Sequence, residues 1–324
     1  MNDVDKGIGA PSAVSGIETK SRPIDEQVTL LIPTLGRDMI LGSLRSVLEG
    51  RRWPGRIVIV DQGQSDNIST WLKQITTLGI ETLHLPSVEV GRSRALNRGL
   101  ERIDSRFVVI TDDDCRVAED WIERLGEHLR ESPDYVFTGR IEAGGHEPVL
   151  AKVLHDEPCV ASKPGLAFDR LSGGNLGVAM GVFRRVGLFD EDPCVAFSED
   201  GEWAYRALRS GVRIAYVPDA IVTHLGWRSR DERERQYAGY ARSHAAFFGK
   251  HIRRGDGFIV LRAVVHLARA CRRWLTGLIS ADREQTAYGR AYLRYFVPGI
   301  LAGLKSSNEP PSLLGVPGKT GREP

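Results

Sequence analysis

The chain has 324 residues, of which 27% are charged, 41% are hydrophobic and 7% are aromatic. This balance excludes two classes of protein, because the apolar content is too high for a disordered chain and too low for many membrane spans. No uninterrupted apolar stretch approaches the ~20 residues of a spanning helix, and no signal-peptide pattern is visible. The four cysteines form no CxxC pair, which argues against a zinc site or a disulfide framework and predicts a reducing, cytoplasmic location.

The formal net charge of +2 is unevenly distributed along the chain. Residues 228–305 contain 16 Lys and Arg against 6 Asp and Glu, so this segment carries +10 and the remainder of the chain carries −8. A basic segment attached to an acidic body indicates that the segment meets an anionic partner.

Apolar runs and helical patterns alternate through the first third of the chain, after a polar leader. Continuous apolar runs such as Gln27–Ile32 are typical of strands buried on both faces of a parallel sheet. The predicted elements are strand 27–32, helix 38–49, strand 56–61, helix 66–78, strand 81–85, helix 91–103 and strand 106–111. They predict an α/β fold with a Rossmann-like, mainly parallel sheet flanked by helices, which binds ligands at the carboxyl ends of its strands.

The second half of the chain is less regular. Its predicted elements are helix 121–130, strand 135–138, loops over 143–174, a helix from 180, helix 199–210, strands 212–217 and 220–223, and helices from 228. Arg262, His266, Arg269 and Arg273 recur at helical spacing and define one basic helix face. We therefore expect a mobile leader (1–26), an α/β domain (27–227), a basic helical extension (228–305) and a loose tail (306–324).

The strongest chemical feature is Asp112-Asp113-Asp114, which follows an apolar strand. Three adjacent carboxylates repel one another, so the cluster costs stability unless a cation or hydrogen-bond donors compensate it. A divalent metal carrying a nucleotide pyrophosphate would do so, because Mg²⁺ and Mn²⁺ prefer oxygen ligands and leave positions open for phosphates. A solvated acidic turn is the alternative that the triplet alone leaves open.

Four further groups each allow two interpretations. Asp61 ends a strand, where it either binds a nucleobase or ribose or caps a turn. The segment 91–99 places arginines near a helix start, which suits an anion site or a solvated basic face. Glu199 and Asp200 begin a predicted helix and serve either the helix dipole or proton abstraction. His224 follows a β-run, and its role as a ligand gains weight only beside the Asp triplet.

In their order and spacing, these residues resemble a known family. The motifs are Leu31–Thr34 with Arg37, Ile59–Asp61, Arg94 with Asn97–Gly99, Asp112–Asp114, Gly173–Asn175 with Phe183–Glu191, Glu199–Asp200 with Arg206, and His224. Each motif is short, but together they resemble a family 2 glycosyltransferase of the GT-A fold across residues 27–226. The resemblance is to bacterial transferases of polysaccharide and lipid-linked sugar biosynthesis in the cell envelope.

The resemblance implies that a hexosyl or rhamnosyl group passes from a nucleotide-sugar to a hydroxyl of a saccharide or lipid-linked saccharide. It implies a metal-dependent, inverting single displacement, with Mg²⁺ or Mn²⁺ held by Asp114 and His224. Asp200 would be the catalytic base, with Glu199 beside it. The donor nucleotide would be bound by Pro33, Thr34, Arg37, Asp61, Arg94, Asp112 and Asp113. The sugar and acceptor pocket would be lined by Gly173, Gly174, Asn175 and Trp203.

Two other functions stay open, a nucleotide-binding partner protein without catalysis and a metal-dependent phosphatase or nucleotidyltransferase. Retention of Asp114, Asp200 and His224 argues against the first, and the second leaves Glu199–Asp200 and His224 unexplained. The loop Gln62–Asp66 departs from the Asp-Asp-Gly-Ser pattern of many relatives, so the base and the sugar stay open.

The basic extension 228–305 also has two interpretations. Its helices either lie peripherally on the inner face of the membrane, with arginines at anionic headgroups, or pack on the α/β domain with their arginines in water. No nucleic-acid motif accompanies these basic residues, so we expect no nucleic-acid partner.

Overall fold

Four of the predicted apolar runs form a parallel half-sheet. The structure is a computed structural model that describes residues 22–145, 155–166, 171–226 and 228–313. The strands lie in the order β3 (Glu81–Pro86), β2 (Trp53–Asp61), β1 (Ile24–Thr34), β4 (Phe107–Ile110), and every pair is parallel. The connecting helices are α1 (Met39–Leu48), α2 (Asp66–Thr76) and α3 (Arg92–Leu100). The apolar side chains at the centre of β1, β2 and β4 have no exposed surface, as expected for strands covered on both faces.

The other half of the sheet is mixed. β8 (Leu176–Ala179) is antiparallel to β4 and is followed in the sheet by β6 (Tyr135–Gly145), β9 (Arg213–Gly226) and β5 (Cys115–Val117), while β7 (Cys159–Ala161) also pairs with β9. The helices of this half are α4 (Trp121–Glu131), α5 (Met180–Val186), the 3₁₀ helix η1 (Pro193–Val195) and α6 (Glu199–Arg209). The predicted α/β fold, a mixed sheet flanked by helices with a helical extension, is confirmed.

Several boundaries differ from the sequence prediction. The strands β5 and β7 are only three residues long and β8 directly follows a Gly-Gly-Asn turn, so the sequence signalled none of them. β1 begins at Ile24, inside the predicted leader. The predicted strands 212–217 and 220–223 form one strand, β9, whose pairing with β6 skips residues 218–220. Pro218 has no N–H for the ladder, which explains the bulge. Most of the predicted leader and the end of the predicted tail lie outside the described residues.

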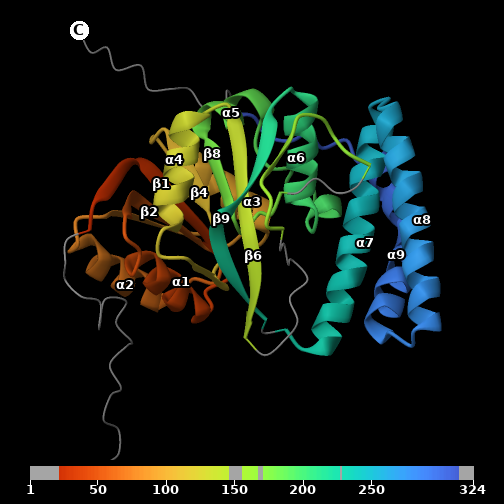
Figure 1. Ribbon diagram of the computed structural model, residues 1–324, viewed down its shortest axis with the longest axis horizontal. Helices are drawn as coiled ribbons and strands as arrows, with labels where there is room; N and C mark the ends of the chain where they lie inside the picture. The colour runs from red at the N-terminus through yellow and green to blue at the C-terminus, as the bar shows by residue number, and fades with distance from the viewer. Residues whose placement is uncertain (1–21, 146–154, 167–170, 227, 314–324) are drawn as a thin grey trace, which may run out of the picture.

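Three long helices follow the sheet, α7 (Arg230–Arg253), α8 (Gly257–Ile279) and α9 (Arg283–Lys305). They stand together on the side of the molecule opposite α1 and α2 (Figure 1). α7 and α9 approach closely through glycines: a Cβ at Gly303 would lie 2.0 Å from the Ala246 carbonyl oxygen, and one at Gly249 would lie 2.2 Å from that of Ile300. None of the helices in the described part of the chain is long and apolar enough to cross a membrane.

The helical extension shares a core with the α/β domain. Phe247 and Phe248 of α7 pack in one buried cluster with Tyr205 of α6. Lys250 of α7 is buried, and its Nζ lies 2.5 Å from Asp190 Oδ2 and 3.2 Å from Asp192 Oδ2, in the loop before α6. α7 is therefore held to the loop that leads into Glu199 by both apolar packing and buried ion pairs.

The predicted basic face of α8 is partly wrong. Arg262 has no exposed surface and His266 is also buried, so neither side chain can meet water or a lipid headgroup. The Arg262 guanidinium lies 5.4 Å from the centre of the Tyr205 ring and 5.8 Å from that of Phe247. Aromatic faces attract a cation electrostatically, which lets this arginine be buried against the core. Arg269 and Arg273, farther along the helix, are exposed.

Candidate active site

The carboxyl ends of β1, β2 and β4 meet at one edge of the sheet. Pro33 and Thr34 lie beside Val60 and Asp61 in the β1–β2 ladder. The N–H of Thr111 donates to the Leu31 carbonyl, and the chain then enters the Asp triplet. The strand ends thus bring together three motifs that are far apart in the sequence, at the edge where such sheets bind ligands.

The carboxylates of the Asp triplet point to different partners, which relieves their repulsion. Asp113 is buried and turns back toward β1, where it accepts a 2.7 Å hydrogen bond from Thr34 Oγ1 and pairs with the Arg37 guanidinium at 3.3 Å. Burial raises the pKa of Asp113, and these two contacts oppose the rise. The Thr34 hydroxyl also accepts from the Gly36 N–H. Asp113 therefore holds the first strand-end loop in place.

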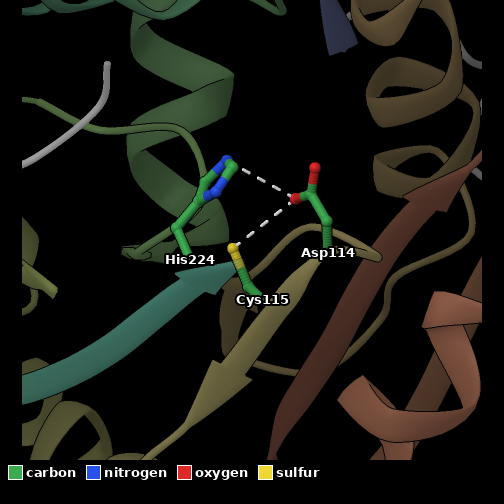
Figure 2. Close-up of side chains that lie close together, drawn as sticks. All are labelled: Asp114, Cys115 and His224. Atoms are coloured by element: carbon green, nitrogen blue, oxygen red, sulfur yellow. Dashed lines mark hydrogen bonds and ion pairs between the residues drawn. The ribbon is translucent and has the colours of Figure 1, made fainter. Parts of the chain in front are cut away.

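Asp114 and His224 form a candidate metal site. His224 Nε2 lies 3.6 Å from Asp114 Oδ1, and the Cys115 thiol donates to the same oxygen at 3.8 Å (Figure 2). The three donor atoms lie within 4.8 Å of one another, and His224 Nδ1 is buried without a hydrogen-bond partner among the described residues. Carboxylate oxygen and imidazole nitrogen are donors that Mn²⁺ accepts, so these two residues fit a divalent cation.

Cys115 does not complete this ligand set. Its side chain is buried, and burial raises the pKa of the thiol well above its usual range. A protonated thiol is a poor ligand, because metals bind the thiolate. The guanidinium groups of Arg37 and Arg228 each lie 4.0 Å from Asp114 Oδ2, so positive charge already surrounds the carboxylate.

Arg92, at the start of α3, joins the triplet to the second acidic cluster. Its Nη2 lies 2.8 Å from Asp112 Oδ1, and its Nη1 lies 3.0 Å from Glu199 Oε1. Burial by itself would lower the pKa of Arg92, but the charges of Asp112, Glu199 and Asp200 raise it, so the guanidinium stays protonated. One side chain therefore bridges two carboxylates that are 87 residues apart in the sequence.

Arg92 is the residue that the sequence prediction missed. The prediction selected Arg94, two residues later in the same motif, but Arg94 is half-buried and makes no ion pair among the described residues. Both arginines lie in the first turn of α3, and side chains two positions apart on a helix do not face the same way. The arginines of the motif could predict an anion-binding site. However, the rotation of α3 about its own axis decides which arginine faces Asp112 and Glu199, and the sequence does not contain this information.

Glu199 and Asp200 begin α6 and differ in accessibility. Glu199 is buried, whereas Asp200 is half-buried and accepts backbone hydrogen bonds from Gly173 (3.2 Å) and Gly201 (2.7 Å). Burial raises the pKa of Asp200 and, together with the charge of Asp200, raises that of Glu199 to about 7, although Arg92 opposes the rise. Carboxylates with raised pKa values are suited to accepting a proton near neutral pH.

The Gly173–Gly174 pair packs tightly against this network. A Cβ at Gly173 would lie 2.7 Å from Arg92 Nη1, and a Cβ at Gly174 would lie 2.9 Å from Asp112 Oδ2. The predicted pocket glycines are therefore beside both acidic clusters, where their small size leaves room for the Arg92 bridge.

Asp61, the predicted nucleobase contact, is buried at the end of β2 and caps a turn. Asp61 has no exposed surface; its Oδ1 accepts from the Gly63 N–H at 2.9 Å, and its Oδ2 accepts from the Ser65 N–H at 2.8 Å and lies 3.2 Å from His84 Nε2. These bonds are the turn cap that the sequence left as the alternative. Asp61 therefore shapes the loop after β2, and its contact with a nucleobase stays a prediction.

The prediction placed Asn175 and Trp203 in the sugar and acceptor pocket, but the structure buries both side chains completely. The Asn175 amide is fully buried and bonds to Trp121 Nε1, at 2.9 Å, and to two backbone carbonyls. Trp203 is fully buried, and its ring centre lies 4.9 Å from that of Phe183. Both residues follow site residues in sequence, but the turn at Asn175 and the rotation of α6 direct their side chains into the core.

The solved structures that the chain resembles share the GT-A fold of glycosyltransferases. A mannosyltransferase from Pyrobaculum calidifontis in complex with GDP-Man and Mn²⁺ has a TM-score of 0.57 and 16% identity, with 90% of both chains covered. Residues 1–349 of S. aureus TarS in complex with UDP-GlcNAc have a TM-score of 0.51 and 14% identity, with 84% of this chain and 92% of TarS 1–349 covered. At these identities the likeness establishes the fold.

The sequence comparisons match part of the chain to a known family. Residues 29–186 match the family described as glycosyl transferase family 2. The chain is 26% identical to the succinoglycan biosynthesis protein ExoA of Rhizobium meliloti, over 68% of this chain and 70% of ExoA. It is 24% identical to chondroitin synthase of Pasteurella multocida over 63% of this chain, but spans only 25% of that protein. The match covers just under half of this chain, and it confirms that the motifs resemble glycosyl transferase family 2.

Proposed function

We propose that this protein transfers a hexosyl or deoxyhexosyl group from a nucleotide-sugar to a hydroxyl acceptor, with a divalent metal and inversion of the anomeric carbon. The observation that carries the proposal is the bridge of Arg92 between Asp112 and Glu199, at 2.8 and 3.0 Å. It supports a single site in which one acidic cluster faces the donor phosphates and the other faces the acceptor.

On the donor side, Asp114 and His224 would hold Mg²⁺ or Mn²⁺. When bound, the cation supplies positive charge against the charge that develops on the departing diphosphate. Thr34 and Arg37 are held at the end of β1 by Asp113, where they can bind the nucleotide. Arg92 places its charge at the amino terminus of α3, and such a helix end favours phosphate groups.

On the acceptor side, Asp200 is our candidate for the catalytic base. Its carboxylate accepts the proton of the acceptor hydroxyl, whose oxygen forms the new bond to the anomeric carbon while the bond to the phosphate oxygen breaks. The electron pair of that bond leaves with the nucleoside diphosphate, and one displacement inverts the carbon. The backbone N–H groups of Gly173 and Gly201 hold the Asp200 carboxylate in position.

The surroundings of Asp200 suit a saccharide acceptor. Phe197, three residues before Asp200, is 47% exposed, and its ring packs edge-on against Tyr240 of α7, with 5.9 Å between ring centres. A partly exposed aromatic side chain offers apolar surface to a ligand. We propose that the acceptor is a saccharide, free or lipid-linked, and that a lipid-linked acceptor is met at the membrane.

Calorimetric titration of UDP-, GDP- and dTDP-sugars, with and without Mn²⁺, tests the proposal on wild type and Asp114→Ala. We expect one nucleotide class to bind only with Mn²⁺ and to lose that binding in the variant. Asp219→Ala is the matched control, because Asp219 lies on the same strand as His224 but pairs with His128 on the surface. Binding of no nucleotide-sugar, or release of phosphate from the donor without sugar transfer, would refute the proposal.

A further inference from the structure

The outer side of α8 is an exposed aliphatic stripe. Its members are 45–86% exposed, and they are Val260, Leu261, Val264, Leu275, Leu278 and Ile279. Their spacings, which include 3, 4, 11, 14 and 18 residues, place them on one side of the helix, and α8 lies at the outer edge of the molecule (Figure 1). Of the fourteen large hydrophobic side chains exposed among the described residues, eight lie on α8 and α9. Such a concentration of apolar surface marks an interaction site.

The two helices that carry most of the exposed apolar side chains, α8 and α9, are basic. α8 contains no Asp or Glu, and residues 257–305 hold eight Lys and Arg against two acids. Arg269 and Arg272 of α8 and Arg290 and Arg294 of α9 are exposed. The partner that covers the stripe must therefore offer apolar material with negative charge beside it.

We propose that this stripe, together with the exposed arginines of α8 and α9, lies on an anionic lipid bilayer, with α8 in the plane of the interface. Aliphatic side chains would enter the acyl boundary, and the guanidinium groups would meet the phosphates of the headgroups. A basic amphipathic helix with this division of faces is typical of such binding. The inference concerns where the enzyme sits and does not depend on the proposed sugar transfer.

A second copy of the chain fits the surface less well. A two-fold symmetric dimer through the stripe would place the same patch on both subunits, so arginines would face arginines. No acid on α8 could neutralise them, and like charges in a partly dehydrated interface repel strongly. A bilayer that contains phosphatidylglycerol supplies the missing negative charge.

Flotation of the full chain with vesicles tests the proposal, using phosphatidylcholine alone and phosphatidylcholine with about one third phosphatidylglycerol. We expect binding only to the anionic vesicles, weakened more than about tenfold by high salt because salt screens the arginines. The double variant Leu275→Glu, Ile279→Glu should weaken binding at least about tenfold, because two apolar side chains are replaced by anions. Arg272→Glu should weaken it mainly at low salt.

Val160→Glu is the matched control, since Val160 is also an exposed aliphatic residue, 58% exposed, but lies on β7. It should bind vesicles like wild type. Circular dichroism melting shows that each variant is folded. Absence of flotation with anionic vesicles at low salt would overturn the proposal, as would equal flotation of the double variant. A dimer in light scattering that the double variant dissociates would assign the stripe to a second copy instead.

Discussion

Replacing Arg92 with alanine removes the guanidinium that touches both acidic clusters. The side chain of Arg92 is 23% exposed, that of Asp112 is 26% exposed and that of Glu199 is 9% exposed, so both ion pairs are largely shielded from water. Removing one partner of a buried pair costs about 3–5 kcal/mol, because it leaves the other charge uncompensated. Partial exposure of Asp112 lowers the cost, and we expect a loss of about 2–4 kcal/mol of unfolding free energy at alkaline pH.

The pH dependence distinguishes this cause from lost packing. In the folded wild type the pKa of Glu199 is raised from the ordinary 4.5 to about 7. Between pH 4.5 and 7 the Glu199 carboxyl is therefore protonated in the folded protein but ionised in the unfolded chain. The free energy of unfolding of the wild type consequently falls as the pH rises from 4.5 to 7. Without the Arg92 charge the folded pKa rises further, so the variant keeps losing stability above pH 7, by up to about 1.4 kcal/mol per pH unit for one proton. The stability difference between wild type and variant should therefore be larger at pH 9 than at pH 6.

Urea unfolding followed by tryptophan fluorescence at these two pH values measures the difference, and urea avoids the screening that a guanidinium salt would add. Arg94→Ala is the matched control in the same helical turn and should change the unfolding free energy by no more than about 0.5 kcal/mol at either pH. A loss below about 1 kcal/mol for Arg92→Ala, or a loss equal at both pH values, would refute the argument from buried charge.

Three further predictions concern Lys250, Glu202 and Asp200. Lys250→Met should cost about 3–5 kcal/mol in urea unfolding, since it leaves Asp190 and Asp192 without their buried cation, whereas the exposed Lys305→Met should cost little. Burial raises the pKa of the Glu202 carboxyl, but Arg206 and His251 outweigh burial and lower this pKa to about 2. The ionised carboxylate should therefore contribute about 3 kcal/mol to the free energy of unfolding above pH 4.5, and this contribution should be lost as the pH falls toward 2. Asp200→Asn should lower kcat by about 10²–10⁴-fold while calorimetric donor binding is kept.

Each of these has an outcome that would contradict it. Equal urea midpoints for Lys250→Met and Lys305→Met would show that the Lys250 pair contributes nothing net. An acid unfolding limb that Glu202→Gln leaves unchanged would remove Glu202 from the pH dependence. Turnover by Asp200→Asn at the wild-type rate would transfer the role of base to another group, with Glu199→Gln as the next variant to measure.

The sequence by itself was sufficient for the parallel half of the fold and for the edge where the site lies. A strand that is buried on both faces needs a continuous run of apolar residues, whereas the loop that follows it can hold polar residues. The sequence pattern therefore predicts the strands β1, β2 and β4, and it also predicts that the Asp triplet lies in the loop after β4. The order and spacing of the motifs also predicted a resemblance to glycosyl transferase family 2, and the match over residues 29–186 confirms this resemblance.

Tertiary structure alone decided which side chains of each motif enter the site. The rotation of α3 selects Arg92 over Arg94, and the rotation of α6 turns Trp203 into the core while leaving Asp200 half-buried. Likewise, the packing of α8 against α7 buries Arg262 and exposes an aliphatic stripe that the basic periodicity did not indicate. Helical spacing fixes which residues share a face, but which face is buried depends on neighbours that are distant in sequence.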